Sequence, residues 1–168
     1  MMNPPSKWRA TKTREMMDDA FQSIINSMSA VRHFTGAAML VIDYPFFSYN
    51  KVVKLAGRHD RTRGFNAYSV TKKAVQGAII PQIKECTALA QIESMGRVFV
   101  VFRWRCGTRN GDPDNRSANK KFVLDSLVKL KVIPTDSPMG IDGFSDFFVY
   151  GQRVEGVDVM LIPKPEED

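Results

Sequence analysis

Three aspartates and one lysine lie around a short helical pattern in the sequence. Asp112 and Asp114 flank Pro113 in a loop, Lys121 lies in the apolar-periodic stretch that follows, and Asp136 comes after that stretch. Residues two apart in an extended loop point the same way, so Asp112 and Asp114 can converge on one cation. Carboxylate oxygens suit Mg²⁺ or Mn²⁺, and a lysine nearby can hold a phosphate oxygen. The set is therefore suited to metal-assisted attack on a phosphate ester.

The same residues also have an ordinary structural interpretation. The stretch Asp-Pro-Asp-Asn at 112–115 is common in turns and at helix starts, where Asn115 or Ser117 can cap the helix. Lys121 and Asp125 are four residues apart and can form a plain surface ion pair. Spacing alone leaves both interpretations open.

Positive charge is distributed unevenly along the chain. The formal net charge is +6 and the isoelectric point is about 9.4. The segment 51–73 contains a single acid, Asp60, and a cluster of basic residues: Lys51, Lys54, Arg58, Arg61, Arg63, Lys72 and Lys73. Such a cluster attracts polyanions and makes their binding depend on salt. A solvated face that only aids solubility is the alternative.

Hydrophobic periodicity predicts one α/β domain with a mixed sheet. An amphipathic helix is expected first, with an apolar side formed by Met16, Met17, Ala20, Phe21, Ile24, Ile25 and Met28. This helix covers residues 12–30, and two further helices are expected at 65–95 and 117–131. Four strands are expected at 38–44, 97–105, 147–150 and 156–162. Pro81 predicts a kink or break in the second helix.

Composition excludes several other classes. A chain of 168 residues suits one domain, and no apolar run approaches the roughly 20 residues that span a bilayer. The N-terminus lacks the apolar core of a signal peptide, so we expect a cytoplasmic protein. Cys86 and Cys106 have neither metal nor disulfide spacing, and His33 and His59 lie far apart. No glycine-rich phosphate loop is present, so no nucleotide cofactor is expected.

The motif residues resemble the RusA family of Holliday junction resolvases. The stretch DPDN at 112–115, Lys121, the DSL at 125–127 and the TDS at 135–137 are similar to that family's D-x-D-N, its lysine before D-A-L, and its later aspartate. The segment SYNK ending at Lys51 and the strand GVDVMLI fit as well.

The resemblance covers roughly residues 39–163. It leaves residues 1–38 as an N-terminal extension that contains the amphipathic helix, and residues 164–168 as an acidic tail.

This resemblance implies a metal-dependent endodeoxyribonuclease that cuts branched DNA, four-way junctions in particular, and that acts as a homodimer. Asp112, Asp114 and Asp136 would hold Mg²⁺ or Mn²⁺, and Lys121 would contact the scissile phosphate. The basic cluster would follow the DNA backbone, assisted by Arg103 and Arg105. A phage or prophage origin is also implied.

Two departures from the family's pattern bear on the site. The stretch between Asp114 and Lys121 is three residues longer than usual, which makes Lys120 a rival for the lysine role and a further candidate for DNA contact. Thr135 stands where the family commonly has a second acid. The alternatives are a nucleic-acid-binding module without catalysis, or a phage structural or replication-associated protein on the same fold.

Overall fold

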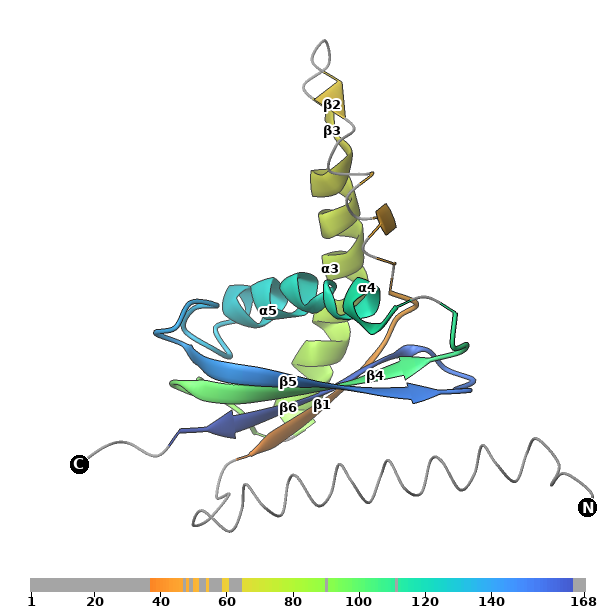
Figure 1. Ribbon diagram of the computed structural model, residues 1–168. Coiled ribbons are helices and arrows are strands. Elements are labelled where there is room, and N and C mark those ends of the chain that lie inside the picture. Colours follow the sequence, from red (N-terminus) through yellow and green to blue (C-terminus); the bar gives the residue numbers. More distant parts are fainter. Residues whose placement is uncertain are drawn as a thin grey trace, which may run out of the picture.

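The sheet of this single α/β domain has four strands in the order β1-β6-β4-β5 (Figure 1). Its strands are β1 (Ala38–Asp43), β4 (Val98–Cys106), β5 (Ile141–Tyr150) and β6 (Gly156–Pro163). β4 and β5 are parallel, whereas β6 runs antiparallel to both β1 and β4, so the predicted mixed sheet is confirmed. The computed structural model describes residues 37–46, 48, 50–51, 54, 59–60, 65–89, 91–110 and 112–164, so the predicted helix 12–30 lies outside it.

Three helices whose bounds are described and a small hairpin accompany the sheet. The helices are α3 (Ala67–Leu89), α4 (Pro113–Ser117) and α5 (Lys120–Lys129). The hairpin pairs β2 (His59–Asp60) with β3 (Phe65–Asn66) and lies beyond the first turn of α3, which rises away from the sheet (Figure 1). Of the helices in this described part of the chain, none is long and apolar enough to cross a bilayer.

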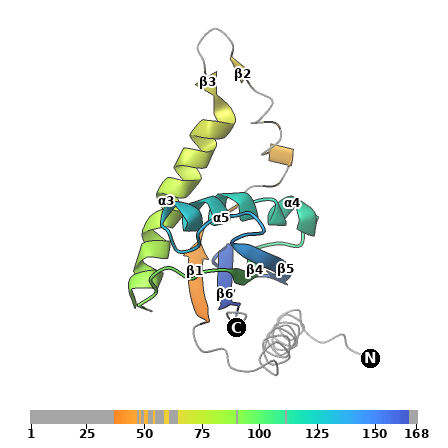
Figure 2. The ribbon, with the colours of Figure 1, turned by 90° about the vertical axis from the view of Figure 1, so that its left-hand side faces the viewer.

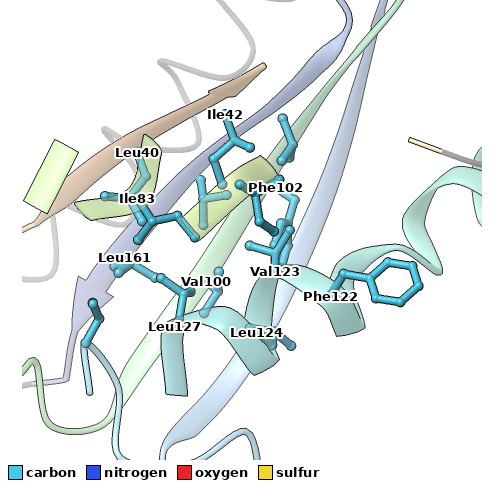
Figure 3. Packing of buried hydrophobic residues seen from close by; sticks show 14 of the residues in the cluster. Leu40, Ile42, Ile83, Val100, Phe102, Phe122, Val123, Leu124, Leu127 and Leu161 are labelled. Atoms are coloured by element: carbon cyan, nitrogen blue, oxygen red, sulfur yellow. The ribbon is translucent and has the colours of Figure 1, made fainter. Parts of the chain in front are cut away.

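α3 and α5 pack on one face of the sheet, here called the first face. Val75, Ile79 and Ile83 of α3 and Phe122, Val123 and Leu127 of α5 are buried there. They meet alternate residues of the strands, which point to one side because the side-chain period of a strand is two. Figure 3 shows Leu40, Val100, Phe102 and Leu161 converging on Ile83 and Leu127. This cluster is the main hydrophobic core.

The opposite side of the sheet, the second face, divides into an apolar end and a charged end. Val101 and Ile162 are buried at the apolar end, with Phe99, Phe147 and Met160 packed against them. At the charged end, Asp158 is only 3% exposed and accepts hydrogen bonds from Arg103 Nε at 2.8 Å and Arg105 Nε at 3.0 Å. Arg105 also pairs with Asp43 at 2.5 Å, which ties β4 to β6 and β1.

Pro81 does not break its helix, because α3 continues through it without interruption. Proline deprives the carbonyl of residue 77 of its donor, but Gly77 and Pro81 are both exposed, so water can reach that oxygen. Tertiary bonds hold the following turn. Gln82 Nε2 donates to Asp43 O at 3.0 Å, and Asp43 N donates to Gln82 Oε1 at 2.8 Å (both views in Figures 1 and 2 place α3 beside β1).

Two predicted helices end or begin elsewhere. α3 stops at Leu89 rather than near residue 95, because Gln91 adopts a left-handed φ of 52° and Ile92 N donates back to Thr87 O at 2.9 Å. The helix expected at 117–131 is α5, which begins three residues later at Lys120, and the short helix α4 precedes it where a loop was expected. Asn119 separates them, since its side-chain amide donates to Arg116 O at 2.8 Å in competition with the backbone.

β5 begins six residues earlier in the chain than the strand predicted at 147–150. The six residues before the predicted start include Asp142, Ser145 and Asp146, whose polar side chains hide the alternation that reveals a strand. The parallel pairing with β4 supplies the backbone bonds that make these residues part of the strand.

Candidate functional site

The motif residues all lie in the connection between the parallel strands β4 and β5. The chain leaves the carboxyl end of β4, passes through α4 and α5 over the first face, and returns to start β5. In open α/β sheets, ligands favour the region beyond the carboxyl ends of strands. Asp112 and Asp114 lie in this region, immediately after β4.

Asp112 and Asp114 are both exposed at the start of α4. Asp112 is the N-cap residue with extended backbone, and Pro113 occupies the first helical position, where its missing N–H costs nothing. The Asp112 carboxylate makes no capping bond to the helix backbone and instead accepts a bond from Asn115 Nδ2 at 3.3 Å. Capping therefore explains the backbone at Asp112 but does not occupy its carboxylate.

The adjacent residues Lys120 and Lys121 point to different surroundings, because neighbours on a helix are about 100° apart. Lys120 reaches the sheet, where its ammonium pairs with Asp146 and lies 4.0 Å from the centre of the Phe144 ring. Lys121 pairs with Asp136 and, at 2.7 Å, with Asp125. Of the two lysines, Lys121 is the one that the structure brings to Asp136.

Lys121 belongs to a row of four alternating charges, here called the ion chain. Lys72 of α3 lies 2.5 Å from Asp125 of α5, Asp125 contacts Lys121, and Lys121 contacts Asp136 in the loop before β5. The hydrogen bonds that Lys121 donates to Asp125 and Asp136 hold the pKa of Lys121 well above its usual value, and the bond to Asp136 lowers the pKa of that carboxyl. Lys121 is therefore a permanent cation at physiological pH.

Asp136→Asn should destabilise the protein slightly at neutral pH and not at all in strong acid. Because its pKa is lowered on folding, the Asp136 carboxylate stabilises the fold above its ordinary pKa, and this contribution is lost as the pH falls through the lowered pKa. The pair is exposed, so the difference in unfolding free energy should be at most about 1 kcal/mol. Urea titrations of both proteins from pH 7 to pH 2 test this; a difference that persists in acid would contradict it.

The three predicted metal ligands are not gathered into one cluster. In the part of the chain that the structure describes, no group of three His, Cys, Asp or Glu residues lies close enough to hold a metal ion. Asp136 is engaged by Lys121, and α4 with the Asn119 break separates Asp114 from the start of α5. The donor set itself suits Mg²⁺ or Mn²⁺, since all three ligands are exposed carboxylates. The three carboxylates are therefore of the right chemical type for Mg²⁺ or Mn²⁺, but they are not close together in this structure.

The predicted DNA-binding residues fall into three groups. Lys51, Lys54 and Lys73 are exposed. Lys72 and Lys120 are engaged in ion pairs, with Asp125 and Asp146 respectively. Arg58, Arg61 and Arg63 lie outside the described residues.

The two arginines expected to assist DNA binding, Arg103 and Arg105, are ion-paired with Asp158 on the second face of the sheet. Their described contacts tie strands together.

Sequence reasoning missed Asp146 as a partner in this region. Trp104 Nε1 donates to Asp146 Oδ1 at 2.8 Å, and Lys120 pairs with the other oxygen, so Asp146 joins β4, β5 and α5. The sequence held one signal for this role: Asp146 alternates with Phe144 and Phe148, so it lies on the same face of β5 as they do, the first face.

Comparisons with known proteins do not assign the chain to a family: no protein-family model matches it, and neither does any curated protein sequence.

Proposed function

We propose that this protein is a metal-dependent endodeoxyribonuclease that hydrolyses phosphodiesters in branched DNA. The observation that supports this most directly is the contact between Lys121 and Asp136, two motif residues 15 apart in the sequence. The RusA resemblance implies that these two residues share one site. Their meeting on the same connection that holds Asp112 and Asp114 agrees with that implication.

In this proposal, Asp112, Asp114 and Asp136 would hold Mg²⁺ or Mn²⁺. A bound ion of this kind supplies an activated water and offsets charge on the phosphate. Lys121 contributes a fixed positive charge toward a phosphate oxygen and cannot serve as a base, because its pKa is raised. Asp125 keeps Lys121 in place, and Lys72 of α3 in turn holds Asp125. The ion chain thus positions the lysine from two helices.

A second candidate function is nucleic-acid binding without cleavage. The specific observation in its favour is the open arrangement of the three carboxylates within the described residues. The three additional residues between Asp114 and Lys121, relative to the family's spacing, fall in the region of α4 and the Asn119 break. A chain that lost the ability to close this site would keep its basic residues and bind DNA without cutting it.

Incubation with a synthetic four-way DNA junction, with and without Mg²⁺, separates the two candidates. Cleavage that requires Mg²⁺ and leaves an unbranched duplex of the same sequence intact supports the junction nuclease. Tight binding with no product in Mg²⁺ or Mn²⁺ supports the binding module. Absence of both binding and cleavage would overturn both candidates.

Replacing Lys54 and Lys73 together by Ala should make DNA binding less sensitive to salt. Each phosphate contact contributes about 0.9 to the slope of log affinity against log salt on duplex DNA, so losing two should flatten that slope by about 1.8. Fluorescence anisotropy at several salt concentrations measures it. Lys84→Ala with Lys129→Ala removes the same charge from two other exposed positions and should leave the slope near that of the parent. Equal slopes in all three proteins would remove Lys54 and Lys73 from the interface.

A further inference from the structure

The carboxyl ends of β4 and β5 hold an arginine and a tyrosine that the proposed metal site does not use. Cys106 and Tyr150 are register partners at these ends, and both side chains lie on the first face with the main core. Arg109 follows the end of β4 by three residues and is exposed. Its guanidinium carbon lies 5.1 Å from the centre of the Tyr150 ring. These two side chains are here called the Arg109–Tyr150 pair.

The Tyr150 ring is held in place at the end of its strand. It is half-buried against the main core. The chain leaves β5 through Gly151, whose φ of 74° is left-handed. Gln152 then donates from its backbone to Cys106 O at 3.1 Å and from its side chain to Tyr150 O at 3.3 Å. These bonds join the ends of β4 and β5, so the ring is a firm support for the guanidinium above it.

The positive charge of Arg109 meets this ring rather than a carboxylate. Nearby, Arg116 lies 3.7 Å from Glu155 and Arg105 pairs with Asp158, whereas none of the ion pairs in the described part of the chain includes Arg109. A guanidinium is planar and weakly hydrated, and it stacks on flat aromatic groups. Because Arg109 is exposed, the side of its guanidinium away from the ring can carry a second flat group.

The Arg109–Tyr150 pair lies close to the carboxylates that would hold the metal. Arg109 precedes Asp112 by three residues, so their Cα atoms are at most about 11 Å apart. The connection from β4 rises to the first face, where α4 begins (Figure 1), and the Tyr150 ring lies on that same face. A DNA strand whose phosphate reaches Asp112 and Asp114 would therefore bring a neighbouring nucleotide to the pair.

The chemistry of the pair suits a nucleobase better than a second phosphate. Asp112 and Asp114 are exposed carboxylates beside it, and like charges repel, whereas a base is uncharged. Bases stack on aromatic rings and on guanidinium planes. A base inside a continuous duplex has both faces covered by its neighbours, so only a base at a branch point or in a single strand offers a free face.

We propose that the Arg109–Tyr150 pair stacks on one nucleobase, at a branch point or in a single strand, next to the cleaved phosphate. This inference rests on the proposed function, from which it takes DNA as the partner. It adds a determinant of specificity, because the pair would favour branched or single-stranded DNA over a continuous duplex.

Binding of single-stranded DNA in EDTA tests this without any cleavage. An oligothymidylate and an abasic oligonucleotide of the same length carry the same phosphate charge, but only the first offers bases. Stacking of one base on an aromatic side chain contributes about 5- to 150-fold in affinity. The parent protein should therefore bind the oligothymidylate at least about fivefold more tightly, measured by fluorescence anisotropy. Arg109→Lys keeps the charge but loses the plane, and it should lower this ratio below about twofold with little change for the abasic strand.

Arg153→Lys is the matched control, because Arg153 is exposed in the connection between β5 and β6 and the exchange also keeps the charge. Tyr150→Leu should act like Arg109→Lys, whereas Tyr150→Phe keeps the ring and should bind like the parent. A parent protein that binds both strands equally, or a ratio that survives Arg109→Lys, would overturn the pair; the nuclease proposal stands if the junction is still cut in Mg²⁺. A parent protein that shows the ratio but cuts no junction overturns the nuclease and leaves the pair in place.

Discussion

Asp114→Asn should lower the rate of four-way-junction cleavage in Mg²⁺ by about a hundredfold or more while leaving junction binding intact. Asparagine has nearly the same shape as aspartate, and Asp114 is exposed, so α4 should keep its fold. The loss of one ligand charge removes part of the stabilisation of the attacked phosphate, for which single electrostatic groups are worth about 10²–10³ in rate. Binding should persist or tighten, because one negative charge facing the phosphates has gone.

Cleavage and gel-shift measurements on one junction preparation test both halves of this result. Glu93→Gln is a suitable control, since it neutralises an exposed acid in the connection between α3 and β4. Asp112→Asn and Asp136→Asn should resemble Asp114→Asn. If Asp114→Asn cuts as fast as the parent protein, the nuclease proposal is wrong; a parent protein that binds without cutting leaves the binding module in its place.

Asp158→Asn should lower the free energy of unfolding by about 3 kcal/mol. Asp158 is buried and neutralises Arg103 and Arg105 together, so its loss leaves two guanidinium groups with a weaker partner. Removing one member of a buried ion pair typically costs about 3–5 kcal/mol. Arg105 keeps bonds to Val154 O and Ile42 O, which places the expected cost at the lower end. For a domain stabilised by about 5–15 kcal/mol this is a large loss.

Urea unfolding at neutral pH, with an unchanged dependence on denaturant, measures the effect of Asp158→Asn. Asp43→Asn is the matched control, because Asp43 pairs with the same Arg105 but its side chain is 57% exposed. Exposed pairs contribute about 1 kcal/mol or less, so this variant should remain close to the parent. Equal losses in the two variants would show that burial of Asp158 does not govern the stability of the network.

The elements that could be predicted from the sequence are those whose patterns follow from burial. β4 and β6 lie in the middle of the sheet, apolar along the whole first face and at one end of the second, so their sequences indicate strands without any knowledge of partners. β5 lies at the edge, and its polar first half depends on pairing with β4, which no local pattern reveals. The sequence left open whether Pro81 kinks or breaks its helix, because the bonds between Gln82 and Asp43 form between distant parts of the chain.

The candidate site shows the same division between local and tertiary information. The motif resemblance was enough to group Lys121 with Asp136. The choice between Lys120 and Lys121 needed the structure, in which the rotation of α5 directs Lys120 to Asp146 and Lys121 to Asp136. The contact between Lys72 and Asp125 depends on how α3 crosses α5. No spacing within the sequence specifies that crossing.

The position of β6 in the sheet bears on how the chain folds as it leaves the ribosome. β6 lies between β1 and β4, yet it is synthesised after both. Translation at about 5–20 residues per second leaves β1 and one edge of β4 without their central strand for several seconds. Unpaired strand edges are sites of aggregation, so β1 and this edge of β4 are exposed to aggregation until residue 163 has been synthesised, longer than in a sheet whose neighbouring strands emerge in succession.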